Sequence, residues 1–356
     1  MAPLEPPTLD QTTLFPGAGA DLLLVTGVSG FVGSHLVEAL AQRGHRLRLL
    51  VRASSRLHWL EGLVRAGRVE LAYGDVRDKA SVAGACVGVR GIFHFAGLVK
   101  ARKAKEFHVA NADGTRYLAE ALAERGLPGG CFVYCSSLAA GGPGFAMEQT
   151  PLPIRTEADP STPITPYGQS KLDGERALRE VADAHGQYRT VVLRPPIVYG
   201  PRDEGLLPLF RLIRRGILPM PAQPDARFSL IYVSDLVDAS VRVAEQGVRG
   251  TYYVDDGRAH TWQELGDLAG SLMDVTPRRI VLREWMAQTV ALGSEAFGLI
   301  SGQAPLLSRW KVREMRESHW VCSSEKARRT WGYDPLVSLE QGLEETLVWY
   351  RQNQWL

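Results

Sequence analysis

The chain has 356 residues, of which 45% are hydrophobic and 22% charged, with a formal net charge of +2. This length suffices to bury the core of one large domain or two smaller ones, and the charge balance gives no reason to expect a nucleic-acid partner. The four cysteines form no C-x-x-C pair, so the sequence predicts no metal centre and favours a reducing, cytoplasmic location.

Residues 1–20 begin without the basic start and apolar run of a secretory signal. Their composition predicts a flexible N-terminal arm rather than part of the folded domain.

The first expected elements are a strand, a glycine turn and a helix. LLLVT (22–26) is followed at once by GVSGFVG, and residues 34–43 have the apolar spacing of a helix. Gly27 and Gly30 allow the backbone to turn tightly against a pyrophosphate, and Gly33 lets the helix pack closely on the strand. The helix N-terminus would then face the phosphates. The alternative interpretation is an ordinary tight loop.

The second expected strand, residues 46–52, ends without the carboxylate that would bind an adenine ribose 2′-hydroxyl. Arg52 stands there instead, followed by Ser54 and Ser55. A planar guanidinium and nearby hydroxyls suit a 2′-phosphate, which predicts NADP in preference to NAD. The alternative is that Arg52 stacks on the adenine.

Three more strands are expected to end within 69–78, 91–97 and 131–137, and helical stretches (34–43, 107–125) alternate with the strands. This alternation predicts an α/β fold with a Rossmann-type, doubly wound parallel sheet. Ligands of such sheets bind at the carboxyl ends of the strands, where Asp75 and Val76 would lie beside the adenine.

From about residue 196 the composition changes to loops, prolines and short helices. We therefore expect a dinucleotide-binding domain over 21–195 and a smaller C-terminal substrate-binding lobe over 196–356, interleaved with the last elements of the sheet. Within that lobe, residues 229–240 predict a strand followed by a helix that Asp235 caps.

Tyr167 and Lys171 lie four residues apart in YGQSK, so a helix would place them on one face. An ammonium beside a phenol favours the phenolate and should lower the tyrosine pKa, which would make Tyr167 a usable proton donor or acceptor. The alternative is a surface tyrosine beside a solvated lysine.

Seven segments occur in the order of one known family: TGVSGFVG (26–33), GDVRD (74–78), HFAG (94–97), NADGT (111–115), YCSS (134–137), YGQSK (167–171) and RPPIVYGPRD (194–203). From about residue 22 to 350 the chain resembles the extended short-chain dehydrogenases/reductases.

The resemblance implies that Tyr167 is the general acid/base and that Ser137 polarises the substrate carbonyl. It implies that Lys171 lowers the pKa of Tyr167 and binds the nicotinamide ribose, and that Asn111 belongs to a water-borne proton path. The choice of Ser137 over its neighbour Ser136 rests on the alignment of the motif.

The implied cofactor is NADP, with NAD as the alternative. The residues expected to bind it are Gly27, Ser29, Gly30, Phe31, Val32, Gly33, Arg52, Ser55, Asp75, Val76, Phe95, Ala96, Gly97, Tyr167, Lys171, Pro195, Ile197 and Val198. The resemblance also implies a homodimer in which the helices carrying NADGT and YGQSK pair across a two-fold axis.

Residues 285–307 form an apolar segment that Glu295, two glutamines and a proline interrupt. We expect a lid or a hydrophobic substrate wall there rather than a membrane span, and peripheral contact with a membrane stays open. This segment resembles the hydroxysteroid dehydrogenase and dihydroflavonol reductase branches, which act on bulky hydrophobic alcohols and ketones.

The sequence thus predicts an NAD(P)-dependent oxidoreductase that interconverts a hydrophobic ketone or aldehyde and an alcohol. One alternative is a sugar-nucleotide epimerase or dehydratase, for which Arg227 would bind a diphosphate. The other is a non-catalytic sensor that binds a dinucleotide without turnover.

Overall fold

The computed structural model describes residues 21–125, 129–144, 154–186, 188–223, 225–282 and 309–356, together with 285, 288–289 and 292–294. The predicted arm over 1–20 and most of the apolar segment 285–307 lie outside the described residues.

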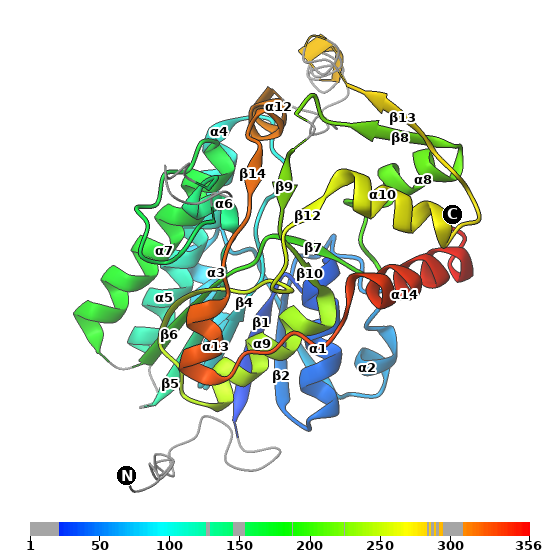
Figure 1. Cartoon of the computed structure of the whole chain (residues 1–356). Helices are drawn as coiled ribbons and strands as arrows, with labels where there is room; N and C mark the ends of the chain where they lie inside the picture. Colours follow the sequence, from blue (N-terminus) through cyan, green and yellow to red (C-terminus); the bar gives the residue numbers. More distant parts are fainter. Residues whose placement is uncertain are drawn as a thin grey trace, which may run out of the picture.

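Seven parallel strands form the central sheet in the order β11-β6-β5-β4-β1-β2-β3 (Figure 1). The strand order reverses direction between β1 and β4, which places a switch point, and hence a ligand crevice, at their carboxyl ends. The doubly wound α/β fold is therefore confirmed. The strands are β1 (Leu22–Thr26), β2 (Arg46–Val51), β3 (Val69–Tyr73), β4 (Gly91–His94), β5 (Gly130–Cys135), β6 (Tyr188–Arg194) and β11 (Gly250–Tyr253).

Helices α1 and α9 cover one face of this sheet, and α3, α5 and α7 cover the other. Because both faces are covered, every residue of β1 and β4 is buried, as continuous apolar runs such as LLLVT predict. The helices are α1 (Phe31–Gln42), α2 (Glu61–Arg65), α3 (Lys79–Ala85), α4 (Ala104–Phe107), α5 (Gly114–Glu124), α6 (Leu138–Gly141), α7 (Pro166–His185), α8 (Leu207–Arg214), α9 (Val233–Glu245), α10 (Trp262–Ser271), α12 (Arg309–Arg316), α13 (Glu325–Trp331) and α14 (Leu339–Gln352).

Between α4 and α5 the chain continues as a π-helix, η1 (His108–Asp113), so the helical stretch expected over 107–125 is one helix with a widened segment. Such π segments occur often at functional sites. Here the π segment contains Asn111.

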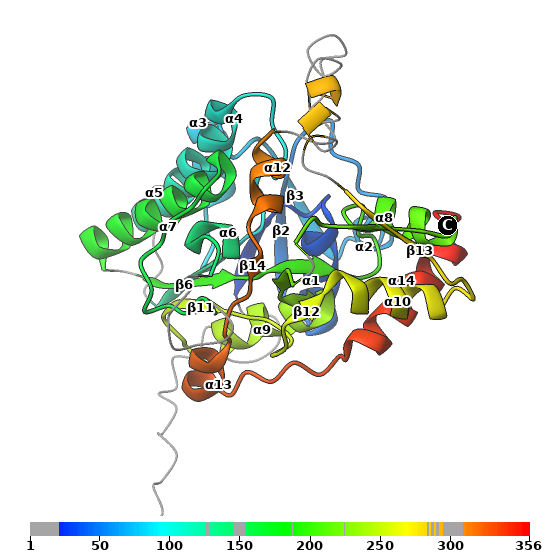
Figure 2. The same ribbon diagram turned by 45° about the horizontal axis from the view of Figure 1, so that its top comes forward.

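The second half of the chain forms three small sheets beyond the carboxyl ends of the main strands (Figure 2). It also contributes β11 and α9 to the central layers, so the division at residue 195 stays a prediction. The additional strands are β7 (Ile197–Tyr199), β8 (Ile217–Met220), β9 (Arg227–Phe228), β10 (Leu230–Tyr232), β12 (His260–Thr261), β13 (Arg278–Val281) and β14 (His319–Trp320).

Asp235 does not cap α9, contrary to the prediction from the sequence. It lies inside the first turn of this helix, and its two carboxylate oxygens accept hydrogen bonds from the backbone nitrogens of Leu336 and Val337, both at 3.2 Å. Its role is still structural, since it ties the segment before α14 to α9. Within the described ranges, no helix has both the length and the apolar character needed to cross a bilayer.

Candidate active site

The glycine turn between β1 and α1 brings three elements together. Gly27 has a φ of +76°, and a Cβ at this position would lie 2.5 Å from the backbone nitrogen of Ala96, after β4. Gly33, in the first turn of α1, faces the Gly27 carbonyl, which leaves no room for a side chain. Both glycines are therefore required for the close approach that a dinucleotide cradle needs.

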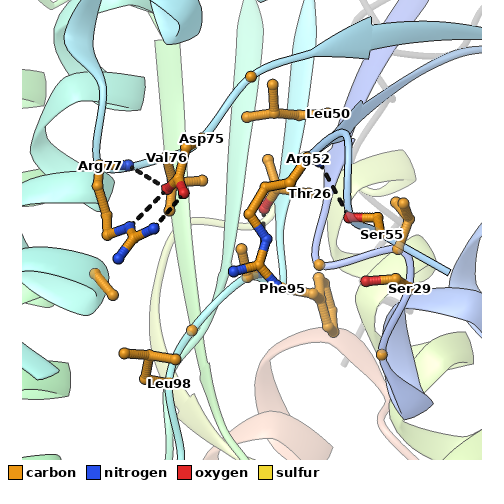
Figure 3. Close-up of a pocket in the computed structure, with 17 residues that line it drawn as sticks. Thr26, Ser29, Leu50, Arg52, Ser55, Asp75, Val76, Arg77, Phe95 and Leu98 are labelled. Atoms are coloured by element: carbon orange, nitrogen blue, oxygen red, sulfur yellow. Dashed lines mark hydrogen bonds and ion pairs between the residues drawn. The ribbon is translucent and has the colours of Figure 1, made fainter. Parts of the chain in front are cut away.

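Beside this turn is a pocket of about 230 Å³ at the carboxyl ends of β1, β2, β3 and β4 (Figure 3). Ten predicted cofactor residues line the pocket: Gly27, Ser29, Gly30, Arg52, Ser55, Asp75, Val76, Phe95, Ala96 and Gly97. Seven further residues line the pocket but were not predicted from the sequence: Thr26, Val28, Leu50, Gly74, Arg77, Leu98 and Ala110. Four of these, Thr26, Val28, Gly74 and Arg77, lie within motifs that the sequence did identify. The motifs were therefore found, but these positions within them were not expected to bind the cofactor.

The remaining predicted cofactor residues lie outside this pocket. Phe31, Val32 and Gly33 form the first turn of α1. Pro195, Ile197 and Val198 belong to the β6–β7 segment, where the Pro195 carbonyl accepts a hydrogen bond from the Leu138 nitrogen at 2.8 Å. The pocket lies where the sequence predicts the adenosine half of a dinucleotide, and the β6–β7 segment lies beside the predicted catalytic serine.

Charges in the pocket are distributed unequally. The Asp75 carboxylate is held by Arg77 at 2.6 Å, and this hydrogen bond lowers the pKa of Asp75 below its usual value. In contrast, the Arg52 guanidinium has no ion pair among the described residues, and it extends into the pocket between Asp75 and Phe95 (Figure 3). The Ser55 hydroxyl accepts the backbone N–H of Arg52 at 3.1 Å. A guanidinium that extends into a pocket without an ion-pair partner fits an anionic group of a cofactor.

Ser137 and Tyr167 meet at the same edge of the sheet, because one follows β5 and the other opens α7. The Ser137 hydroxyl lies close enough to the Tyr167 phenol to lower the pKa of Tyr167 through hydrogen bonding. The Ser137 hydroxyl also accepts the backbone N–H of Ala139 at 3.1 Å and so caps α6, which fixes its position. The Ser137 and Tyr167 hydroxyls therefore lie at the same edge of the sheet, an arrangement that suits binding of one substrate oxygen.

Ser136 is engaged elsewhere. Its hydroxyl donates to the Glu175 carboxylate at 2.5 Å, and both residues are buried. Glu175 also receives two hydrogen bonds from Arg194 on β6, at 2.9 and 2.6 Å. Of the two adjacent serines, Ser137 is thus the one that contacts Tyr167.

The prediction that Lys171 lowers the pKa of Tyr167 is wrong for this structure. Burial raises the pKa of Tyr167 well above its usual value, and the hydrogen bond to Ser137 only reduces that shift. Lys171 instead donates to the Cys135 carbonyl at 2.6 Å and stands over the Tyr134 ring at 4.6 Å. Burial lowers the pKa of Lys171 itself.

Asn111 holds the loop after β4 against α7. Its Oδ1 accepts the Leu98 N–H at 2.8 Å, and its Nδ2 donates to the Leu98 carbonyl at 3.0 Å and to the Ser170 hydroxyl at 2.9 Å. A Cβ on Gly97 would lie 3.0 Å from the Asn111 oxygen and 3.5 Å from Lys171 Nζ. Two of the predicted catalytic residues, Asn111 and Lys171, thus lie beside the loop after β4 at Gly97.

His94 joins this loop to α5, a contact that was not predicted from the sequence. His94 is fully buried, with Nδ1 2.7 Å from the Thr26 hydroxyl and Nε2 3.1 Å from the Thr115 hydroxyl. Because Thr115 donates to the Asn111 carbonyl at 2.5 Å, it must accept from His94 Nε2–H. Nδ1 then accepts from Thr26, which in turn accepts the Ala96 N–H at 3.1 Å.

Residues 23–254 match the NAD dependent epimerase/dehydratase family, and the chain belongs to that family. This confirms the resemblance to extended short-chain dehydrogenases/reductases and identifies the protein as an NAD-dependent oxidoreductase-type enzyme, not a non-catalytic sensor.

Three similar proteins span nearly the whole chain. Ceramide reductase of Caulobacter vibrioides is 32% identical over 94% of this chain and 96% of its own length. The 2-alkyl-3-oxoalkanoate reductase of Stenotrophomonas maltophilia is 28% identical over 90% and 97%. The structure of dTDP-glucose 4,6-dehydratase from Streptomyces venezuelae, with NAD bound, has a TM-score of 0.75 and 24% identity over 94% and 98%, a likeness of fold.

Proposed function

We propose that this enzyme is an NADP-preferring oxidoreductase that interconverts a hydrophobic ketone or aldehyde and the corresponding alcohol. The observation that carries the proposal is the placement of Ser137, after β5, and Tyr167, in the first turn of α7, at the same carboxyl edge of the sheet. The names of the two relatives support the substrate class, since both are reductases of long-chain or alkyl-substituted compounds.

The bound nicotinamide would supply the hydride. In the reducing direction, the Tyr167 hydroxyl donates its proton to the developing alkoxide, and Ser137 stabilises the same oxygen with a hydrogen bond. The raised pKa of Tyr167 keeps this hydroxyl protonated at neutral pH, as a proton donor requires. Lys171, beside Gly97, would orient the cofactor ribose.

Replacing Tyr167 by Phe removes the proton donor but keeps the ring. We expect at least a 100-fold loss of kcat, the usual contribution of general acid catalysis, with NADPH affinity nearly unchanged. The measurement is NADPH absorbance at ~340 nm with a panel of hydrophobic ketones and aldehydes, plus fluorescence titration of NADPH binding. Tyr117→Phe, on α5, serves as the control and should keep full activity.

A near-wild-type rate for Tyr167→Phe would overturn the assignment of the proton donor. A panel of nucleotide sugars belongs in the same assay. Conversion of a nucleotide sugar without net change in NADPH would indicate an epimerase or dehydratase in place of a net reductase.

Replacing Arg52 by Gln tests the cofactor preference. A charge-assisted hydrogen bond contributes about 1.5–3 kcal/mol, so kcat/KM for NADPH should fall roughly 10- to 100-fold while that for NADH stays the same. Arg65→Gln, an exposed arginine paired with Glu61, is the control. An equal loss with both cofactors would mean that Arg52 does not contact a 2′-phosphate.

Two further features of the protein stay predictions. Its four cysteines form no disulfide, and we propose a cytoplasmic location. We also propose a homodimer through α5 and α7, which pack side by side as an outer layer of the structure.

A further inference from the structure

Two basic segments lie at the edge of the molecule above the candidate active site. The first is the loop after β4 and the start of α4, and the second is α12. Eight exposed basic residues belong to them, and we call these the basic rim: Lys100, Arg102, Lys103, Lys105, Arg309, Lys311, Arg313 and Arg316. Only two acidic residues, Glu106 and Glu314, lie within 99–107 and 309–316. The rim therefore has a large positive excess in a chain whose net charge is only +2.

The two halves of the rim are brought together by aromatic contacts that lead to Tyr167. The ring centroids of Phe107, on α4, and Trp310, on α12, are 5.7 Å apart. Phe107 in turn contacts the Tyr167 ring at 6.0 Å. Figure 2 shows α4 and α12 beside each other at the same end of the molecule. A line of three ring contacts, with Phe107 buried in the middle, thus runs from the basic rim to the predicted proton donor.

Helix α12 is anchored directly on the helix that carries Tyr167. Glu314 accepts a hydrogen bond at 3.2 Å from the hydroxyl of Thr165, the residue that caps α7. At the last residue of α12, the Arg316 carbonyl accepts from the side-chain amide of Gln223, in the loop after β8. The α12 half of the rim is therefore anchored to the folded structure beside the site.

Apolar side chains are exposed among these charges. Val99 is 69% exposed and Met315 38% exposed, and Trp310 is partly exposed. Basic residues alternating with exposed apolar groups and a tryptophan are characteristic of surfaces that lie at a lipid–water interface. A nucleic acid would match the charge equally well but not the exposed valine and methionine.

We propose that the basic rim docks on an anionic lipid bilayer and that the hydrophobic substrate enters from the bilayer past Trp310 and Phe107. The positive excess is complementary to anionic headgroups. Each lysine or arginine near such a surface contributes a small binding free energy, and a cluster of them adds up to stable binding. The route of the substrate rests on the proposed function, whereas the docking surface rests on the rim alone.

The test is sedimentation of the full-length protein with vesicles of phosphatidylcholine, or of phosphatidylcholine and phosphatidylglycerol in equal amounts. Binding is expected only to the anionic vesicles, and it should weaken as salt shortens the Debye length from ~10 Å at 0.1 M to ~3 Å at 1 M. Each basic residue near the surface contributes roughly fivefold to partitioning. The double variant Lys103→Glu and Lys105→Glu should therefore lower the partition coefficient at least about 30-fold.

The matched control is the double variant Arg125→Glu and Arg249→Glu. Both arginines are exposed, one at the end of α5 and the other before β11, at the opposite edge of the sheet. This control changes the net charge equally but should retain vesicle binding. Absence of binding by the wild type, equal loss in both double variants, or full displacement from vesicles by short RNA would overturn the proposal.

Activity separates this inference from the proposed function. Both double variants should reduce a short, water-soluble ketone with NADPH at the wild-type rate, because neither pair contacts the catalytic groups. With a long-chain ketone embedded in anionic vesicles, only the rim variant should lose activity. If vesicle binding is intact but no carbonyl substrate is reduced, the proposed function fails and the docking surface stands.

Discussion

His94 illustrates how a single side chain ties the loop after β4 to α5 and the adjoining π-helix. It is neutral, since burial, aided by the positive charge of Lys171, lowers its pKa to about 3. Its two ring nitrogens connect Thr26 at the end of β1 with Thr115 on α5, and through them the Ala96 N–H with the Asn111 carbonyl. A substitution at His94 should therefore alter the structure of both the pocket beside Thr26 and the π-helix that contains Asn111.

The depressed pKa of His94 makes stability depend on pH. In the unfolded chain the imidazole takes up a proton below about pH 6.5, but in the folded protein it stays neutral down to about pH 3. Its contribution to stability is therefore present above pH 6.5 and is lost as pH falls toward 3, at about 1.4 kcal/mol per pH unit.

Replacing His94 by Gln removes this titration. The difference in the free energy of unfolding between the wild type and His94→Gln, measured with urea, should therefore shift by about 2 kcal/mol between pH 7 and pH 5, because the wild type loses stability relative to the variant. His185→Gln, at the last turn of α7, is a suitable control that should leave the change in free energy of unfolding between pH 7 and pH 5 as it is in the wild type. A constant difference between wild type and His94→Gln at both pH values would show that His94 is not held neutral.

At the scale of elements, α7, β5 and β6 are joined by a buried ion pair. Glu175 on α7 binds Arg194 on β6 and Ser136 at the end of β5, and Arg194 also donates to the Tyr253 hydroxyl at 2.9 Å. Ser136 precedes Ser137, and Glu175 follows Lys171 by one turn. The pair thus fixes the distance between the serine turn and the helix of Tyr167.

Replacing Glu175 by Gln should destabilise the protein by about 3 kcal/mol, since removing one partner of a buried pair leaves the other charge uncompensated. We also expect kcat to fall at least about tenfold with little change in NADPH affinity, because Ser137 loses its support while the pocket is unaffected. Urea unfolding and steady-state kinetics measure both effects.

Glu180→Gln, on the same helix, is the matched control. Glu180 pairs with Arg116 at 2.7 Å, but the pair is exposed, so the loss should be at most about 0.5 kcal/mol. Equal effects of the two glutamine substitutions would argue against a positioning role for Glu175.

At the scale of the whole molecule, the C-terminal helix α14 packs against the segment between β2 and α2. Trp349 contacts Trp59 at 5.3 Å, and Arg202 stands over the Trp59 ring at 5.0 Å. Trp59 belongs to the segment between β2 and α2 that carries Arg52 and Ser55. The last turns of the chain therefore support the loop that is proposed to bind the 2′-phosphate.

Replacing Trp349 by Ala should lower the free energy of unfolding by about 2 kcal/mol, because it removes aromatic packing in a partly buried cluster. NADPH should bind several-fold more weakly, with kcat preserved. Trp355→Ala is the comparison, since Trp355 contacts Trp349 at 4.9 Å without a described contact to Trp59. Equal NADPH affinity in the two variants would contradict the link between α14 and the segment between β2 and α2.

The order of the elements and the glycine turn could be predicted from the sequence because their signals are local. Apolar runs such as LLLVT specify buried strands, and the spacing of Gly27, Gly30 and Gly33 specifies a tight turn into a helix. The same local logic placed Tyr167 and Lys171 on one helix. It also placed most of the pocket residues, since the motifs end at the carboxyl edge of a parallel sheet.

Contacts between distant segments were decided only by the tertiary structure. Asp235 binds backbone groups 101 and 102 residues away, and Lys171 binds the Cys135 carbonyl, so a cap and a tyrosine partner expected from local spacing were both wrong. The contact of Trp310 with Phe107 likewise joins segments that no periodicity relates. The sequence by itself determined the scaffold, because strand and helix signals act over a few residues. The partners of buried charges and rings depended on the folded structure, because burial brings together groups that are far apart along the chain.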